Sequence, residues 1–170
     1  AAQIKRGDLS MPNDDLMADM YLLVDQMCND AGLQWYELSN WAKPGHECLH
    51  NIAYWKSANW WGLGPGAHSH IDKKRFWNVK HPTAYKQKLF GKESPIADSE
   101  QLTDEQLRDE SIMLAIRMRS GLSLDLLSKG AQERILQYQS SGHLNQINGS
   151  LQLTAQGRLI ADRLVREALG

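Results

Sequence analysis

Residues 36–69 read YELSNWAKPGHECLHNIAYWKSANWWGLGPGAHS, and this stretch carries most of the information in the chain. Together with Trp35 it holds five of the six tryptophans. The sextet HNIAYW stands at 50–55, and a glycine-dense segment, GLGPGAHS, closes the stretch at 62–69. The stretch therefore contains the motifs from which the function of the chain can be argued.

Regular patterns predict the elements around this stretch. Apolar residues at three- and four-residue spacing over 13–31 indicate an amphipathic helix, with Asn13 or Asp14 as its N-cap and Gly32 as its stop. The other elements expected in this half are extended segments at 33–38, 51–55 and 60–63, a hairpin at 69–79 and a helix from Pro82 to about Phe90.

The composition changes after residue 92. Residues 93–101 are polar and include Pro95, which indicates a linker between a first part, 1–92, and a second part, 102–170. The elements expected beyond it are a helix with a Thr103–Gln106 capping box ending near Gly121, shorter helical segments at Ser123 and in the 130s, an Asn148-Gly149 hairpin over 144–153 and a last helix capped by Thr154. We therefore expect an α+β fold whose second part is a helical, winged-helix-like domain.

Charge and hydropathy argue against several classes of protein. Nineteen basic and twenty acidic residues give a net charge of −1. Residues 129–170 hold five basic and three acidic side chains, a weak surplus for binding nucleic acid. No apolar run reaches the roughly 18 residues of a membrane span. The first ten residues lack the apolar core of a signal peptide and an initiator Met, so we expect a cytoplasmic protein and a piece of a longer chain.

The metal motifs that the sequence formally contains are weak. Two cysteines, Cys28 and Cys48, are too few for a disulfide framework or for an iron–sulfur cluster, and we interpret them as structural thiols. Residues 46–50, HECLH, match the zinc motif H-E-x-x-H, which requires a helix. This copy directly follows Pro44-Gly45, so we interpret it as a chance match.

The HNIAYW sextet is the best candidate for a binding site. An imidazole such as that of His50 can ligate heme iron, and the rings of Tyr54 and Trp55 can cover a porphyrin face. Asn51 can orient the imidazole through its second nitrogen. On the residues alone, a hydrogen-bonded structural histidine is the commoner outcome, so both interpretations stay open.

Two further motifs flank the sextet. The glycines at 62, 64 and 66 let the backbone turn sharply and approach a ligand, although a purely structural turn explains them equally well. No Lys-Ser/Thr follows them, which excludes a P-loop. Before the sextet, YELSN at 36–40 brings Glu37 and Asn40, whose side chains can bind a ligand or cap neighbouring backbone.

Together these motifs resemble the oxygen-independent coproporphyrinogen-oxidase-like branch of the radical SAM proteins, and within it the HemW heme chaperones. Residues 36–85 carry the specific motifs, and 8–31 and 101–170 match more loosely. The resemblance implies that residues 1–92 are the C-terminal part of a partial (β/α) barrel. It also implies a heme-binding set consisting of His50 as the iron ligand with Asn51, Tyr54 and Trp55.

The same resemblance implies an S-adenosylmethionine pocket lined or shaped by Gly62, Gly64, Ala67 and Glu37. The family's C-x-x-x-C-x-x-C loop, which binds a [4Fe–4S] cluster, has no counterpart in this sequence. We therefore expect neither the cluster nor radical catalysis from this chain alone. The implied function is to bind heme and pass it to an acceptor protein.

Two alternatives stay open. The longer protein could be an oxygen-independent coproporphyrinogen III oxidase, which decarboxylates two propionates to vinyl groups. In a different class, the chain could be a non-catalytic interaction module in which the tryptophans are only core, buried and indifferent to heme, whereas a binding face would leave several partly open. We also expect the first part to expose apolar surface that drives self-association.

Overall fold

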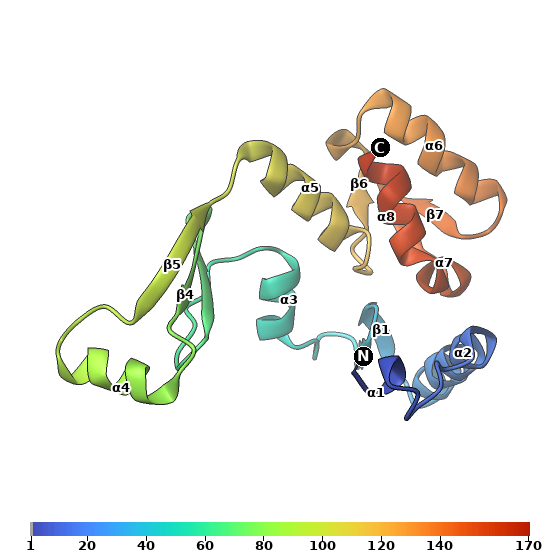
Figure 1. Cartoon of the computed structure of the whole chain (residues 1–170). Helices are drawn as coiled ribbons and strands as arrows, with labels where there is room; N and C mark the ends of the chain where they lie inside the picture. Colours follow the sequence, from blue (N-terminus) through green and yellow to red (C-terminus); the bar gives the residue numbers. More distant parts are fainter. Residues whose placement is uncertain (1) are drawn as a thin grey trace.

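The computed structural model describes residues 2–170 (Figure 1). A short helix, α1 (Ala2–Lys5), precedes the long helix α2 (Asp14–Asp30). As predicted, α2 starts after Asn13, because the Asn13 side chain accepts a hydrogen bond from the N–H of Leu16 at 2.8 Å. The chain leaves α2 through Gly32, whose φ of +75° suits the residue that follows a helix end.

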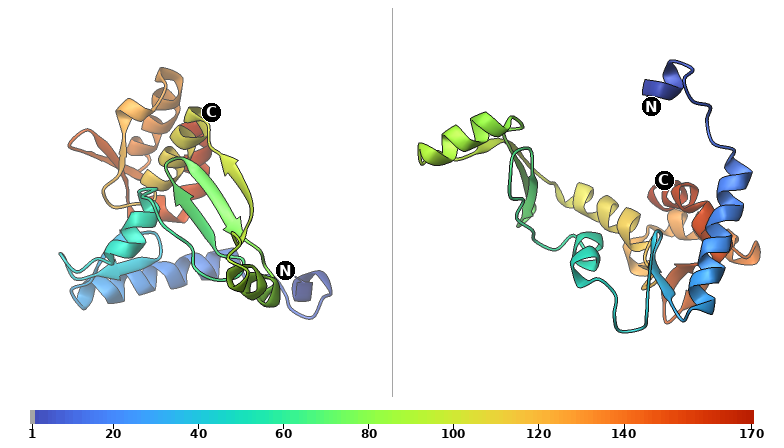
Figure 2. Two further views of the ribbon diagram at one scale, coloured as in Figure 1. Left: turned by 90° about the vertical axis from the view of Figure 1, so that its left-hand side faces the viewer. Right: turned by 90° about the horizontal axis from the view of Figure 1, so that it is seen from below.

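A hairpin of β1 (Gln34–Glu37) and β2 (Asn40–Ala42) follows and confirms the expected strand at 33–38. In the right-hand view of Figure 2, α2 runs along one edge of the molecule beside β1. The apolar stripe of α2 is not covered there. Its four predicted members expose 56–62% of their surface: Leu16, Met20, Leu23 and Met27. The periodicity thus predicted the helix correctly, while its apolar side faces solvent.

The sextet forms a helix, α3 (Leu49–Trp55), and the expectation of an extended segment at 51–55 was wrong. Its backbone is helical because the N–H groups of Ile52 and Lys56 donate to carbonyls four residues earlier. Tyr and Trp favoured a strand on propensity, which is a weak guide beside tertiary context. Residues 60–63 make only an isolated bridge between Trp60 and His70.

Three antiparallel strands form the next sheet, in the order β3 (His68–Ile71), β4 (Lys74–Asn78) and β5 (Ile96–Gln101). The predicted hairpin is confirmed, with Asp72 and Lys73 both at positive φ as a tight two-residue turn requires. Helix α4 (Pro82–Phe90) also matches its predicted bounds.

The predicted linker at 93–101 is instead largely β5. This strand pairs with β4 from Lys74 to Asn78, with a register shift near its end. All six of its residues are exposed, so its backbone pairing holds it in place. A strand with no buried face leaves no hydrophobic pattern, which is why the sequence alone suggested a linker.

The second part follows the predicted order of elements. Its members are α5 (Asp104–Ala115), β6 (Leu122–Ser123), the 3₁₀ helix η1 (Leu124–Leu126), α6 (Lys129–Ser140), β7 (Leu144–Ile147), β8 (Ser150–Leu153), α7 (Ala155–Leu159) and α8 (Ala161–Leu169). The capping box of Thr103 and Gln106 is present, and Asn148-Gly149 turns the hairpin at positive φ. Helix α5 stops at Ala115, earlier than the expected end near Gly121, because the chain continues in tight turns.

The hydrophobic core lies in this second part. Its large, fully buried side chains come from α5 and the residue that follows it, from α6 and α8, and from the sheet β6-β8-β7: Ile112, Ile116, Leu122, Ile135, Leu144, Leu151 and Leu164. Leu107, Ser111 and Met118 lie outside the main core contacts, along a groove beside α3. Mixed α and β content is confirmed.

A buried ion pair joins the two parts. The guanidinium of Arg158 on α7 donates to both carboxylate oxygens of Asp25 on α2, at 2.8 and 2.5 Å, and the two residues are only 6% and 8% exposed. The indole N–H of Trp41 donates to the same carboxylate at 2.6 Å. The guanidinium also lies 4.7 Å from the Trp35 ring centroid and 5.4 Å from that of Tyr21.

This geometry predicts an acid-sensitive link. The hydrogen bond from Arg158 holds the pKa of Asp25 below its ordinary value of 3.8, with Trp41 and the positive charge of Arg158 adding to the effect against desolvation. A lowered carboxylate pKa stabilises the folded state above that ordinary pKa, and this stability is lost as pH falls through the folded pKa. Asp25→Asn should cost about 3–5 kcal/mol at pH 7 and should remove this pH-dependent step below about pH 4.

Urea unfolding of both proteins between pH 3 and 7 measures these effects. As a control, Asp25→Leu combined with Arg158→Met should cost less than Asp25→Asn, because no charge is then left buried without its partner. Equal stability of Asp25→Asn and wild type across this range would show that the ion pair does not hold the two parts together.

Candidate functional site

Helix α3 presents the sextet on two faces. Residues four apart lie above one another on a helix, so His50 and Tyr54 share one face while Asn51 and Trp55 share another. The rings of His50 and Tyr54 meet edge-on with their centroids 4.8 Å apart. The structure therefore brings His50 and Tyr54 together and directs Asn51 and Trp55 elsewhere.

The His50 face borders a small cavity. It is lined by His50, Ala53, Tyr54, Ala58, Asn59 and Trp60. The Tyr54 ring lies 5.0 Å from that of Trp60, so aromatic surface continues from the helix to the loop that follows it. Within residues 2–170, no hydrogen bond occupies the exposed imidazole of His50. Its nitrogens are therefore free to bind a ligand, and apolar ring surface stands beside them.

The other face attaches α3 to the rest of the protein. The Asn51 amide donates to the Tyr36 hydroxyl at 3.1 Å and to the Glu37 carboxylate at 3.4 Å. Trp55 lies in the groove beside α5 together with Met118. Asn51 thus contacts β1 and is not hydrogen-bonded to the His50 ring that it was expected to orient.

The glycine segment is a structural turn against β3 and β4. A Cβ on Gly62 would stand 2.0 Å from the carbonyl oxygen of His68, so no larger residue fits. The Gly62 N–H donates to Ser69 Oγ at 2.9 Å, and Asn78 donates to the carbonyls of Gly62 and Gly64. The carbonyl of Ala67 accepts from the Asn78 N–H. These polar groups are used within the fold, and the S-adenosylmethionine pocket expected at Gly62, Gly64, Ala67 and Glu37 stays a prediction.

Sequence reasoning missed His70. It lies on β3, is 3% exposed, and neither of its ring nitrogens has a hydrogen-bond partner in residues 2–170. Its ring stacks at a tilt against Trp60, with the centroids 4.9 Å apart. His70 therefore ends a series of ring contacts that starts at His50 and passes through Tyr54 and Trp60. The alternation His68-x-His70 in a predicted strand was the available signal, because it places both imidazoles on one face.

The tryptophans do not form a core. None of the six is buried, and Trp61 is 65% exposed. Partial exposure favours a binding face over an interaction module with a tryptophan core. The H-E-x-x-H match also fails as a zinc motif, because α3 begins at Leu49 and leaves His46 and Glu47 outside the helix.

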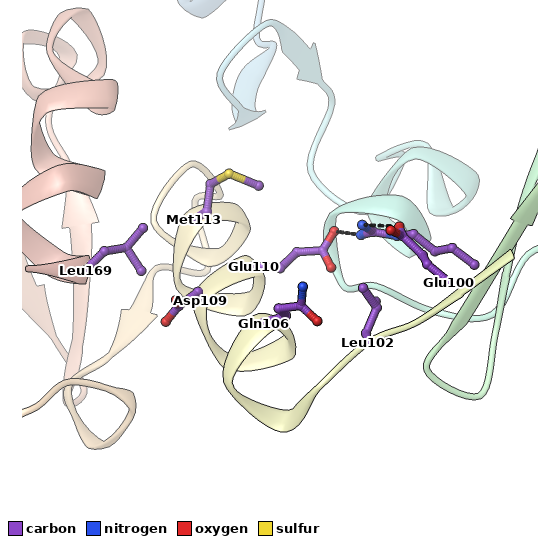
Figure 3. A pocket seen from close by; sticks show the side chains of 8 residues that line it. Glu100, Leu102, Gln106, Asp109, Glu110, Met113 and Leu169 are labelled. Carbon is purple, nitrogen blue, oxygen red and sulfur yellow. Dashed lines mark hydrogen bonds and ion pairs between the residues drawn. The ribbon is translucent and has the colours of Figure 1, made fainter.

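A separate cleft lies between the β4–β5 strands, α5 and the end of α8 (Figure 3). Figure 3 shows Glu110 and Glu100 directed toward the same guanidinium, that of Arg75, with which both form ion pairs. Asp109 and Leu169 lie toward the other end of the cleft. These ion pairs occupy the charged groups at the Arg75 end of the cleft. None of the residues expected to form a site lines the cleft.

Comparison with known proteins identifies the class. Residues 102–160 match the family model of the HemN C-terminal domain. The structure of coproporphyrinogen III oxidase (HemN) from Escherichia coli, a radical SAM enzyme, has the same fold over 92% of this chain and 41% of its own, with a TM-score of 0.67 at 17% identity. The second part of the chain is thus a HemN C-terminal domain.

The sequence is more similar to a particular group. Heme chaperone HemW of Mycobacterium tuberculosis (strain H37Rv) is 45% identical over 170 residues, which are all of this chain and 44% of the relative. Heme chaperone HemW of Synechocystis is 37% identical over 122 residues, 70% of this chain and 29% of the relative. The chain is therefore a homologue of the HemW proteins that carries a HemN C-terminal domain, and it spans less than half the length of these relatives. Among residues 2–170, no helix is long and apolar enough to cross a membrane.

The close approach at Gly62 predicts a strong effect of a single methyl group. Gly62→Ala should destabilise the first part by at least about 1–3 kcal/mol, the usual cost of overpacking, since the clashing atom is backbone. Urea unfolding followed by tryptophan fluorescence reports on this part, because all six tryptophans lie between residues 35 and 77. Gly130→Ala in α6 is the matched control, where the added carbon meets nothing closer than 3.5 Å; equal midpoints for the two variants would contradict the prediction.

Proposed function

We propose that this chain is part of a heme chaperone of the HemW type, in which α3 binds heme and the protein passes it to an acceptor. The observation that carries the proposal is the arrangement on α3, where an exposed imidazole without a hydrogen-bond partner stands beside aromatic rings and a cavity. The homology to HemW proteins over the whole chain supports it. That the protein passes heme to an acceptor is inferred because those relatives are heme chaperones.

The residues present fit a heme group. His50 would supply the axial nitrogen ligand, and Tyr54 and Trp60 would cover part of the porphyrin face. Trp55 and Asn51 would act from the other face of α3, about 100° around the helix axis, by holding the helix in place. When bound, the heme iron supplies the coordination bond, and the protein supplies the ligand and the apolar surroundings.

The rest of the longer protein belongs to the same proposal. We infer that residues 1–92 complete a partial barrel and that residues 102–170 form a winged-helix-like domain. An S-adenosylmethionine pocket near Gly62, Gly64, Ala67 and Glu37 would need residues from outside this chain, because the polar groups described above are already bonded within it. The two cysteines cannot provide the three thiolates of a cluster loop.

A hemin titration followed by Soret absorbance tests the ligand assignment. Wild type should give a saturable Soret shift, and His50→Ala should weaken binding by at least about tenfold, since even partners of a metal ligand have effects of that size. His46→Ala is the matched control, because His46 lies close in sequence but outside α3.

The alternative ligands are separated by the same experiment. Loss of the Soret shift in His68→Ala or His46→Ala, but not in His50→Ala, would move the iron ligand away from α3. Equal, weak binding by wild type and all variants would contradict heme binding by this chain.

The exposed face of α2 supports a second proposal, that the chain self-associates. Large apolar side chains gather on this helix without a covering element, and burying them against another copy is favourable. Multi-angle light scattering should show a mass that rises with concentration for wild type. Met20→Lys with Leu23→Lys should stay monomeric, whereas Gln87→Lys on the exposed side of α4 should behave as wild type. A wild type that stays monomeric at high concentration would contradict this proposal.

A further inference from the structure

A buried carboxylate lies where α3 meets β1. The Glu37 side chain is 1% exposed, and none of the ion pairs within residues 2–170 includes it. Burying a carboxylate without a cation is strongly unfavourable unless hydrogen bonds satisfy its oxygens. The donors that the fold supplies therefore show which parts of the chain this carboxylate holds together.

The donors come from two places. Ser39 donates its backbone N–H to Oε2 at 3.2 Å and its hydroxyl to Oε1 at 3.3 Å, and the Asn40 amide also donates to Oε1. These groups belong to the turn after Glu37 and to the first residue of β2. The long-range donor is Asn51 of α3, whose amide reaches Oε1 at 3.4 Å and the neighbouring Tyr36 hydroxyl at 3.1 Å.

Helix α3 depends on such an attachment. It has seven residues, none of them buried, and its N-cap residue Cys48 makes no side-chain cap hydrogen bond. A helix of this length is not stable in water by itself. Successive residues of a helix are about 100° apart around its axis. Fixing Asn51 against β1 therefore also fixes the direction in which His50 and Tyr54 point.

The same end of β1 is tied to the second part of the chain. The Arg119 N–H donates to the Tyr36 carbonyl at 3.0 Å, and Glu37 forms an isolated β-bridge with Met118. Met118 also lines the groove that holds Trp55. Glu37 thus contacts the candidate heme helix on one side and the segment after α5 on the other.

We propose that Glu37 is a positioning residue for the heme site. Its carboxylate, acting through Asn51, holds α3 in the rotation that presents His50 to heme, and it connects that helix to the HemN C-terminal domain. The inference rests on the proposed role of His50. It gives Glu37 and Asn51 a role in holding the site, in place of direct contacts with S-adenosylmethionine and heme.

Exchanging donor and acceptor tests this pairing. Asn51→Asp places a second carboxylate against Glu37 and should lower the hydrogen-exchange protection of residues 49–55, measured without heme on the whole chain, by about tenfold or more, the effect of losing a hydrogen bond to a charged group. Hemin affinity should fall by a similar factor. Glu37→Gln alone should lower both quantities by a smaller factor, because the new amide keeps an oxygen that can accept from Asn51 while the negative charge of the acceptor is lost. Adding Glu37→Gln to Asn51→Asp should restore both quantities, since the new amide then donates to the new carboxylate.

The controls separate positioning from general stability. Ser39→Ala removes the hydroxyl donor to Glu37, keeps the backbone N–H donor and does not touch Asn51, so hydrogen exchange in residues 49–55 should stay unchanged. Amides of α6 and α8 report global unfolding and should be equally protected in all variants. The positioning role is wrong if adding Glu37→Gln does not reverse the losses caused by Asn51→Asp. It is also wrong if the substitutions change hydrogen exchange in residues 49–55 but leave hemin affinity unchanged. Wild type could instead fail to bind hemin while the hydrogen-exchange protection of residues 49–55 falls and recovers with the two substitutions as expected. In that case the heme function is wrong, and the attachment of α3 to Glu37 is supported.

Discussion

The two parts of this chain depend on one buried guanidinium. Arg158 and Asp25 are separated by 133 residues, and their bidentate contact joins α7 to α2. A buried charge pair contributes most when its remaining groups are satisfied. Here Trp41 donates to the carboxylate and the rings of Trp35 and Tyr21 face the guanidinium, while the buried Nε of Arg158 has no hydrogen-bond partner within residues 2–170. Because the first part has little apolar core of its own, this polar link holds α2 and the β1–β2 hairpin against the second part.

The candidate site is connected to this ion pair through the β1–β2 hairpin. In the β1–β2 hairpin, Trp35 and Trp41 contact the Arg158–Asp25 pair, and Glu37 contacts α3. One short hairpin therefore contacts both the ion pair and the helix that carries the HNIAYW sextet. The C-terminal domain reaches the same hairpin a second time through Arg119. A change in the packing of the HemN C-terminal domain would thus alter the contacts of α3 with Tyr36 and Glu37 of β1. These contacts give a physical reason why the HemN C-terminal domain and the HNIAYW sextet occur in the same chain.

Local chemistry allowed much of the fold to be predicted. Asn148-Gly149 favours its two-residue turn, Thr103 and Asn13 start their helices with side-chain caps, and these interactions span only a few residues. The failures share a cause. The α3 segment carries strand-favouring rings but is held as a helix by contacts with β1, and β5 has no buried face and is held by pairing with β4. Neither set of contacts is encoded within the segment itself.

For the site, the sequence by itself determined which residues are candidates: the HNIAYW sextet, with its likeness to HemW proteins, and the glycine segment at 62–69. Only the tertiary structure decided how they are used. It placed His50 and Tyr54 on an open face, turned Asn51 toward a buried Glu37, and left His70 buried without a partner. The reason is that side-chain identity fixes what bonds a residue can make, whereas burial and partner depend on segments that are distant in sequence and meet only when the chain folds.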